Sequence, residues 1–163
     1  MLKILSACLV LSSGFFSTTV CAEKISETDA LVTYKAADEF EMVKENMVMA
    51  ITNQGLKVSG YLHIAEMMQR TAKDLGFNNV FHHAESIEFC SALMSHRMVQ
   101  LDPANAAVCP FTINIYSKAD SPEQVYVSVR KIYLQGDDDK AKAALNQKIN
   151  QWLDAIVVEG LDE

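Results

Sequence analysis

The residues of this chain best suited to chemistry are two cysteines, Cys90 and Cys109. Cys8 and Cys21 fall in an N-terminal segment with the features of a cleaved leader, so Cys90 and Cys109 are the cysteines of the mature chain. Two such thiols have three uses: a structural disulfide, two separate thiols, or a shared redox or metal site. Export to an oxidising compartment and the even count favour the disulfide.

Cys90 stands where a predicted strand over 84–90 leads into a predicted helix over 91–100. A thiol at a helix start meets free backbone N–H groups and the positive end of the helix dipole, and both can lower its pKa. Cys90 is therefore the candidate reactive thiol. The alternative is a small residue that fills the corner between strand and helix, a role that cysteine performs well.

The alternation of the strands argues against a bridge between the two thiols. Glu88 and Cys90 share the polar face of one strand, whereas Cys109 shares a face with the apolar Phe111 and Ile113. If the intervening helix is a return crossover, the two strands run parallel and the cysteines lie at opposite ends. This reasoning favours Cys90 for function and places Cys109, the second thiol or disulfide partner, nearer the core.

A predicted hairpin over 109–116 and 124–132 has one apolar face and one hydrogen-bonding face. The hydrogen-bonding face is a ligand floor, a self-association face, or a sheet surface in contact with water. We place the candidate ligand or thiol site on it, where an anion or a small polar molecule would bind. Its residues are Glu88, Cys90, Asn114, Tyr116, Tyr126 and Arg130.

The sequence predicts neither a cofactor nor a metal site. His82 and His83 are adjacent and should point to opposite sides of an extended segment, so they would not share one ion. The methionines fall in predicted helices, where filling the core is their ordinary role. Catalytic motifs are missing as well: the chain has no nucleophile elbow, no phosphate loop and no paired carboxylates at catalytic spacing.

The first 22 residues have the features of an export signal. Lys3 provides the positive start, an apolar run follows, and Val20-Cys21-Ala22 fits the small-residue pattern, so cleavage is predicted after Ala22. A lipid-attachment box ending at Cys8 would come too early for processing. We therefore expect a soluble protein in the periplasm.

The mature chain then has 141 residues, which suits a single domain over 23–163 with its core at about 31–133. The leader takes one of the 14 basic residues and none of the 21 acidic ones, which leaves a net charge of −8. An acidic chain of this kind disfavours nucleic acid or anionic lipid as a partner. No later segment is apolar enough to span a membrane.

Strands alternate with helices along the chain, which predicts an α/β sandwich with a mixed sheet of four or five strands. A helix over about 138–158 comes last. It carries Trp152 on or near its apolar stripe, and it either packs on the domain or forms a homodimer contact. The other predicted elements are strands at 31–35 and 56–63 and helices at about 38–54 and 64–75.

From about Phe40 to Ile132 the chain resembles the domain-of-unknown-function family 302, in the exported branch that has proline after the second cysteine. The resemblance implies a compact α/β fold and marks both cysteines, but it implies no activity. The chain differs from many relatives at Ser91-Ala92, where those relatives have Asn-Pro. The matching segments are 40–44, 53–58, 87–92, 101–103, 109–111, 115–116 and 125–127.

These observations predict a binding or accessory protein of the periplasm rather than an enzyme. Its partner would be a small molecule or another periplasmic protein. The alternative function is thiol-based redox or sulfur handling through Cys90.

Overall fold

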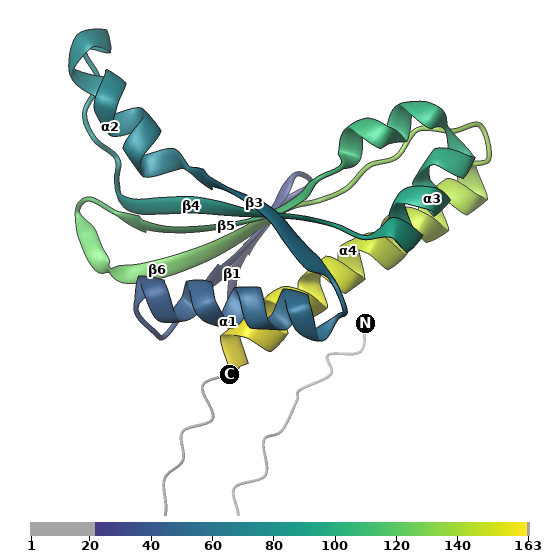
Figure 1. Ribbon diagram of the computed structural model, residues 1–163, viewed down its shortest axis with the longest axis horizontal. Coiled ribbons are helices and arrows are strands. Elements are labelled where there is room, and N and C mark those ends of the chain that lie inside the picture. Colours follow the sequence, from purple (N-terminus) through teal and green to yellow (C-terminus); the bar gives the residue numbers. More distant parts are fainter. Residues whose placement is uncertain (1–21, 163) are drawn as a thin grey trace, which may run out of the picture.

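The computed structural model describes residues 22–162 (Figure 1). The predicted leader therefore lies, apart from Ala22, outside the described residues. The elements are β1 (Glu23–Glu27), β2 (Leu31–Lys35), α1 (Phe40–Asn53), β3 (Lys57–His63), α2 (Ile64–Leu75), β4 (Phe81–Cys90), α3 (Ala92–Leu101), the short 3-10 helix η1 (Pro103–Val108), β5 (Phe111–Lys118), β6 (Ser121–Arg130) and α4 (Asp139–Asp162).

The strands form one sheet in the order β1-β2-β6-β5-β4-β3, and every neighbouring pair is antiparallel. This confirms the α/β sandwich, although the sheet has six strands instead of four or five and is antiparallel rather than mixed. All five residues of β1 are exposed. Because β1 has no alternation of buried and exposed residues, the hydrophobic pattern of the sequence does not predict a strand there. Its hydrogen-bonded pairing with β2 is what makes it a strand.

The segment between β4 and β5 explains the missing parallel pair. α3 and η1 lie beyond one end of the sheet, and the chain re-enters at that same end (Figure 1). A return at the same end makes β5 antiparallel to β4, with Phe89 opposite Phe111. Both helical segments are therefore part of a wide connection, not a crossover.

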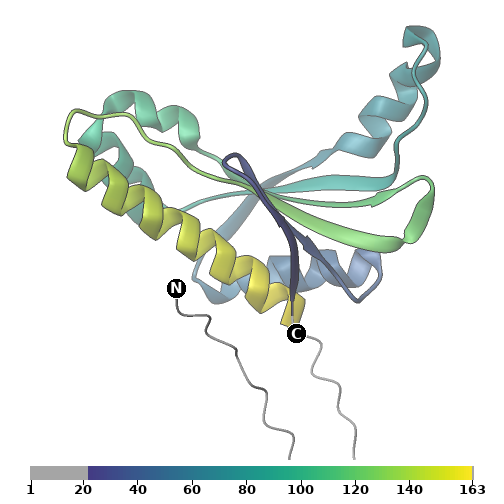
Figure 2. The ribbon, with the colours of Figure 1, turned by 180° about the vertical axis from the view of Figure 1, so that it is seen from behind.

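Helices α1 and α4 lie together on one face of the sheet, where they cover the core (Figures 1 and 2). Trp152 of α4 packs edge-on against Phe89 and Phe111, with ring centroids 6.1 and 5.6 Å away. The final helix thus packs on the domain through Trp152. The fully buried side chains of the core include Tyr34, Met47, Ile51, Ile87, Ile113, Ile115, Ile149, Leu153 and Ile156.

A glycine allows α1 and α4 to approach closely. A Cβ placed on Gly160 would lie 2.7 Å from Met47 Cε and 3.2 Å from the Asn46 carbonyl oxygen. Met47 is fully buried, so it has no room to retreat.

Asn105 holds the α3–η1 connection in place. Its side chain is 2% exposed and donates to the carbonyl oxygens of Met98 and Gln135, both at 3.0 Å. It also accepts from the Gln135 amide at 2.8 Å. These bonds tie η1 to α3 and to the segment after β6, and they position the chain that enters β5 through Cys109.

Candidate functional site

The face of the sheet opposite α1 and α4 carries a row of polar side chains across four strands. Register places Ser86 beside Asn114, Asn114 beside Ser128, and Ser128 beside Thr33. Ser86 donates to Asn114 Oδ1 at 3.3 Å, and the hydroxyls of Thr33 and Ser128 are 3.1 Å apart. This polar row is the centre of what we call the open face.

Aromatic residues lie beside the polar row. Tyr116 and Tyr126 stack with ring centroids 5.2 Å apart, and Phe81 meets Tyr116 edge-on at 5.8 Å. The Lys118 ammonium lies 5.4 Å from the Tyr126 ring centroid. These rings provide flat apolar surface next to hydrogen-bonding groups.

A groove of about 390 Å³ runs along this surface, and we call it the open-face groove. Its volume is within the range of small-molecule sites. The lining includes one cation, Arg130, and no acidic residue. The lining residues are Leu31, Thr33, Phe81, Thr112, Asn114, Tyr116, Ser128 and Arg130.

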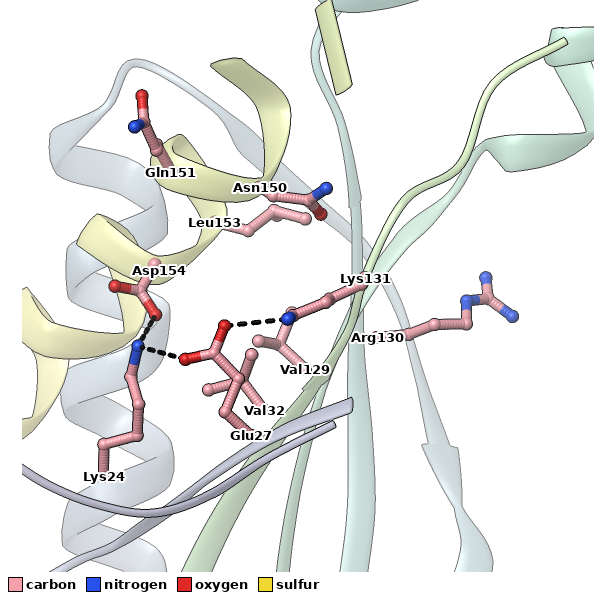
Figure 3. A pocket seen from close by; sticks show the side chains of 10 residues that line it. All are labelled: Lys24, Glu27, Val32, Val129, Arg130, Lys131, Asn150, Gln151, Leu153 and Asp154. Atoms are coloured by element: carbon pink, nitrogen blue, oxygen red, sulfur yellow. Dashed lines mark hydrogen bonds and ion pairs between the residues drawn. The ribbon is translucent and has the colours of Figure 1, made fainter. Parts of the chain in front are cut away.

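A second cavity, of about 200 Å³, lies on the other side of β6, between β1, β2 and α4 (Figure 3). Its charges pair with one another: Lys24 lies 3.2 Å from Glu27 and 3.3 Å from Asp154, and Lys131 lies 2.7 Å from Glu27. In Figure 3 the Arg130 side chain points away from this network. The network fastens β1 to α4, whereas Arg130 stays available to the open-face groove.

The predicted site residues divide between the groove and its surroundings. Asn114, Tyr116 and Arg130 line the groove, and Tyr126 supports it by stacking on Tyr116. Glu88 lies outside it, with its Oε2 3.2 Å from the Cβ position that a side chain at Gly60 of β3 would occupy.

The two cysteines lie together at one end of β4 and β5. The Cys90 thiol is close enough to the Cys109 thiol for Cys109 to raise its pKa, and Cys109 Sγ lies 3.1 Å from Ser95 Oγ. Neither cysteine is in a disulfide. The expectation that parallel strands would separate them is wrong, because the chain re-enters the sheet at the end it left. Cys109 is partly buried against the core, as its apolar neighbours predicted.

The environment of Cys90 favours the protonated thiol. Burial, the hydrogen bond to Cys109 and the charges around it raise the pKa of Cys90 to about 11, against an opposing bond from the Phe111 amide. The expected lowering at a helix start is not found. The N-cap of α3 is Ser91, which accepts the Met94 amide itself and stands between Cys90 and the helix.

The histidine pair differs from its prediction. A register irregularity between Phe81 and His83 interrupts the alternation of β4, and the His82 and His83 rings lie 4.4 Å apart at their centroids. Phe40 stacks on His83 at 4.7 Å. Within residues 22–162 no group of three or more His, Cys, Asp or Glu side chains is arranged to hold a metal ion.

Five lining residues of the groove are absent from the predicted site: Leu31, Thr33, Phe81, Thr112 and Ser128. Leu31 and Thr33 belong to β2, whose position beside β6 is a long-range pairing with no local signal. Phe81 belongs to an early part of β4 that precedes the predicted strand. The one sequence signal for Thr33 is its place between two apolar residues of a predicted strand, Val32 and Tyr34, which puts it on the opposite face from these buried residues.

Comparison with known proteins gives the family. Residues 32–156 match the model of the Domain of unknown function DUF302. The chain belongs to the DUF302 family. The match confirms the resemblance read from the sequence. The crystal structure of an uncharacterized conserved DUF302 protein from Bacillus stearothermophilus is similar, with a TM-score of 0.64 and 14% identity over 79% of this chain and 96% of that chain.

At that identity the likeness between the two DUF302 proteins shows a shared fold only. None of the curated proteins compared with the chain matches it. Within the described part of the DUF302 chain, no helix has the length and apolar character needed to cross a membrane.

Proposed function

We propose that this DUF302 protein is a periplasmic binding protein whose ligand is a small anion with a flat apolar part. The open-face groove carries this proposal, because it combines one cation with aromatic and hydroxyl groups and has no acidic lining. A carboxylate or similar anion would pair with Arg130. Its apolar part would lie along Tyr116 and Phe81, and Asn114 would supply or accept a hydrogen bond.

The charge of the groove suits such a ligand. In the cavity on the far side of β6, the two lysines and two carboxylates pair with one another. Arg130, in contrast, has no ion pair among the described residues and lines the open-face groove. A guanidinium next to an aromatic surface favours planar anions, because it offers two parallel hydrogen bonds to a carboxylate.

Binding of cinnamate and its uncharged analogue, cinnamyl alcohol, tests the proposal by calorimetry and amide NMR. We expect cinnamate to bind more tightly and to shift amide signals of β5 and β6. Arg130→Gln should weaken cinnamate about 10- to 100-fold, the usual cost of a charged hydrogen bond, and should leave the alcohol unchanged. Arg97→Gln, which alters an exposed arginine on α3, is the matched control.

Equal binding of the two probes, or the same loss in both arginine variants, would contradict the groove as an anion site. Export is tested separately on the full-length chain by cell fractionation and by the mass of the recovered protein. We expect a periplasmic product that begins at Glu23.

A second candidate function is a reversible disulfide, and the closeness of the Cys90 and Cys109 thiols at the paired ends of β4 and β5 favours it. A disulfide-bearing exchange protein would act as the oxidant. One cysteine thiolate attacks its disulfide and releases a thiolate, and the other cysteine then attacks the mixed disulfide. Two protons and two electrons leave the pair, an S–S bond forms between Cys90 and Cys109, and the oxidant gains two thiols.

Thiol counting on the mature protein, before and after reduction, separates the two states. We expect the count to change from two to none and back across a series of thiol–disulfide buffers. Cys109→Ser should leave a single thiol at every buffer composition. A pair that stays reduced in strongly oxidising buffer, or a bridge that resists strong reductants, would contradict a reversible role.

A further inference from the structure

Helix α2 stands away from the body of the domain (Figures 1 and 2). Of its twelve residues only Ala65 is buried, and its main packing contacts are with β4. The helix and the segment that follows it nevertheless expose a concentration of large apolar side chains. This α2 patch consists of Met67 (44% exposed), Met68 (37%), Leu75 (64%), Phe77 (70%) and Val80 (54%).

A helix in this position needs a partner. Isolated helices of about 12–15 residues are marginal in water, and most helices in proteins are stabilised by packing of an apolar face. In α2 the apolar stripe is well formed, with Met68, Thr71 and Leu75 at helical spacing, yet it faces solvent. Contiguous exposed apolar surface of this kind usually marks an interaction site.

The charges near the patch indicate which partner it accepts. The segment over 64–80 contains Glu66, Arg70, Lys73 and Asp74 and is therefore neutral, within a mature chain of net charge −8. A neutral patch has no excess of basic residues to attract an anionic lipid surface. It is also a surface on which two copies of an acidic protein can meet without strong repulsion.

We propose that the α2 patch binds the same patch of a second copy of this chain, with the two α2 helices antiparallel. A two-fold dimer requires one surface that complements itself. The patch provides both a projection and a hollow. Leu75 and Phe77 are exposed beside a hollow of about 240 Å³ that Met68 and Ala72 help to line.

The charges of α2 also complement themselves in this arrangement. Arg70 and Asp74 are four residues apart and lie on the same flank of the apolar stripe. With the two apolar stripes facing each other and the helices crossing at the level of residue 72, Arg70 of one copy lies beside Asp74 of the other, and symmetry makes this pair twice. Neither residue has an ion pair within the described chain.

The oligomeric state of the mature protein tests the proposal by sedimentation and by light scattering after gel filtration. We expect a dimer that dissociates on dilution. Leu75→Glu should give a folded monomer, since it places a charge in the contact. Leu93→Glu, at an equally exposed leucine of α3 (58% exposed), is the control and should stay dimeric. Circular dichroism checks that both variants remain folded.

A mixing experiment tests the antiparallel arrangement itself. Arg70→Glu leaves only acidic groups at these two positions, and Asp74→Lys leaves only basic ones, so each variant alone should dimerise about tenfold more weakly than the wild type. Mixed together, the two variants should form a heterodimer, because opposite charges then face each other across the interface. An intrachain effect of either substitution would not be repaired by mixing.

Three results would overturn the proposal: a wild-type protein that remains monomeric at millimolar concentration, a Leu75→Glu variant that dimerises as well as Leu93→Glu, or variants that do not recover on mixing. A monomer that binds phosphatidylglycerol vesicles through α2 would assign the patch to a membrane surface instead. The proposal is independent of the ligand site on the open face.

Discussion

The reactivity of Cys90 toward an alkylating reagent provides a direct test of its environment. Its pKa of about 11, against an ordinary value of 9.0, means that the folded protein holds this thiol protonated across the neutral range. Only the thiolate attacks iodoacetamide, so the rate follows the ionised fraction. At about pH 8 a thiol with a pKa near 9 is about one-tenth ionised, and one with a pKa near 11 about one-thousandth.

The ionised fractions predict alkylation up to about 100-fold slower than that of an ordinary cysteine thiol. Although part of Cys90 is desolvated, the residue remains exposed to water, which screens its neighbours, so we expect a slowing between about 10- and 100-fold. Because the pKa of Cys90 is raised, the rate at which Cys90 of the reduced protein is alkylated should keep rising with pH beyond the ordinary thiol range. It should level off only near the raised value.

The assay is a time course of alkylation on the fully reduced protein at several pH values, with an unfolded sample as the reference. Trypsin cleaves at Arg97, between the two cysteines, so mass spectrometry follows Cys90 and Cys109 in separate peptides. Cys109→Ala should speed the reaction at Cys90, because it removes one of the groups that raise the pKa. A Cys90 rate that levels off below about pH 8 would refute the reasoning and restore the activated thiol expected at a helix start.

Three further predictions concern the framework and are checked by urea unfolding. Asn105→Ala should destabilise the protein by about 2–4 kcal/mol, because it leaves buried backbone groups without partners; stability within about 0.5 kcal/mol of wild type would show that water replaces the side chain. Tyr34→Phe should cost about 1 kcal/mol through the lost hydrogen bond to Asp154, and a larger loss would point to altered packing instead. Gly160→Ala should cost about 1–3 kcal/mol because its methyl group would meet Met47, and a stabilised variant would mean that helix propensity outweighs the contact.

The local character of most elements could be predicted from the sequence. Alternation placed Phe111 and Asn114 on opposite faces of a strand, and the structure buries the first and leaves the second on the open face. Helical spacing likewise predicts α1 and α4 from the sequence. These properties follow from residues a few positions apart, which is the range over which hydrophobic periodicity carries information.

The arrangement of the site could be predicted only in part. Asn114, Tyr116 and Arg130 were identified from the hairpin, because β5 and β6 are neighbours in both sequence and space. Leu31 joins them through the pairing of β2 with β6, which connects residues far apart in the chain. Such pairings depend on which strand buries its apolar face best against the others, a property of the whole sheet.

The two cysteines likewise have some properties that nearby residues set and others that depend on the whole fold. The sequence by itself determined that Cys90 ends a strand and that Cys109 stands next to apolar residues. Only the tertiary structure decided that the two thiols lie close together, because the direction of β5 depends on where the chain re-enters the sheet after η1. It also decided the ionisation of Cys90, since the pKa of a thiol depends on burial and on neighbours that folding brings together.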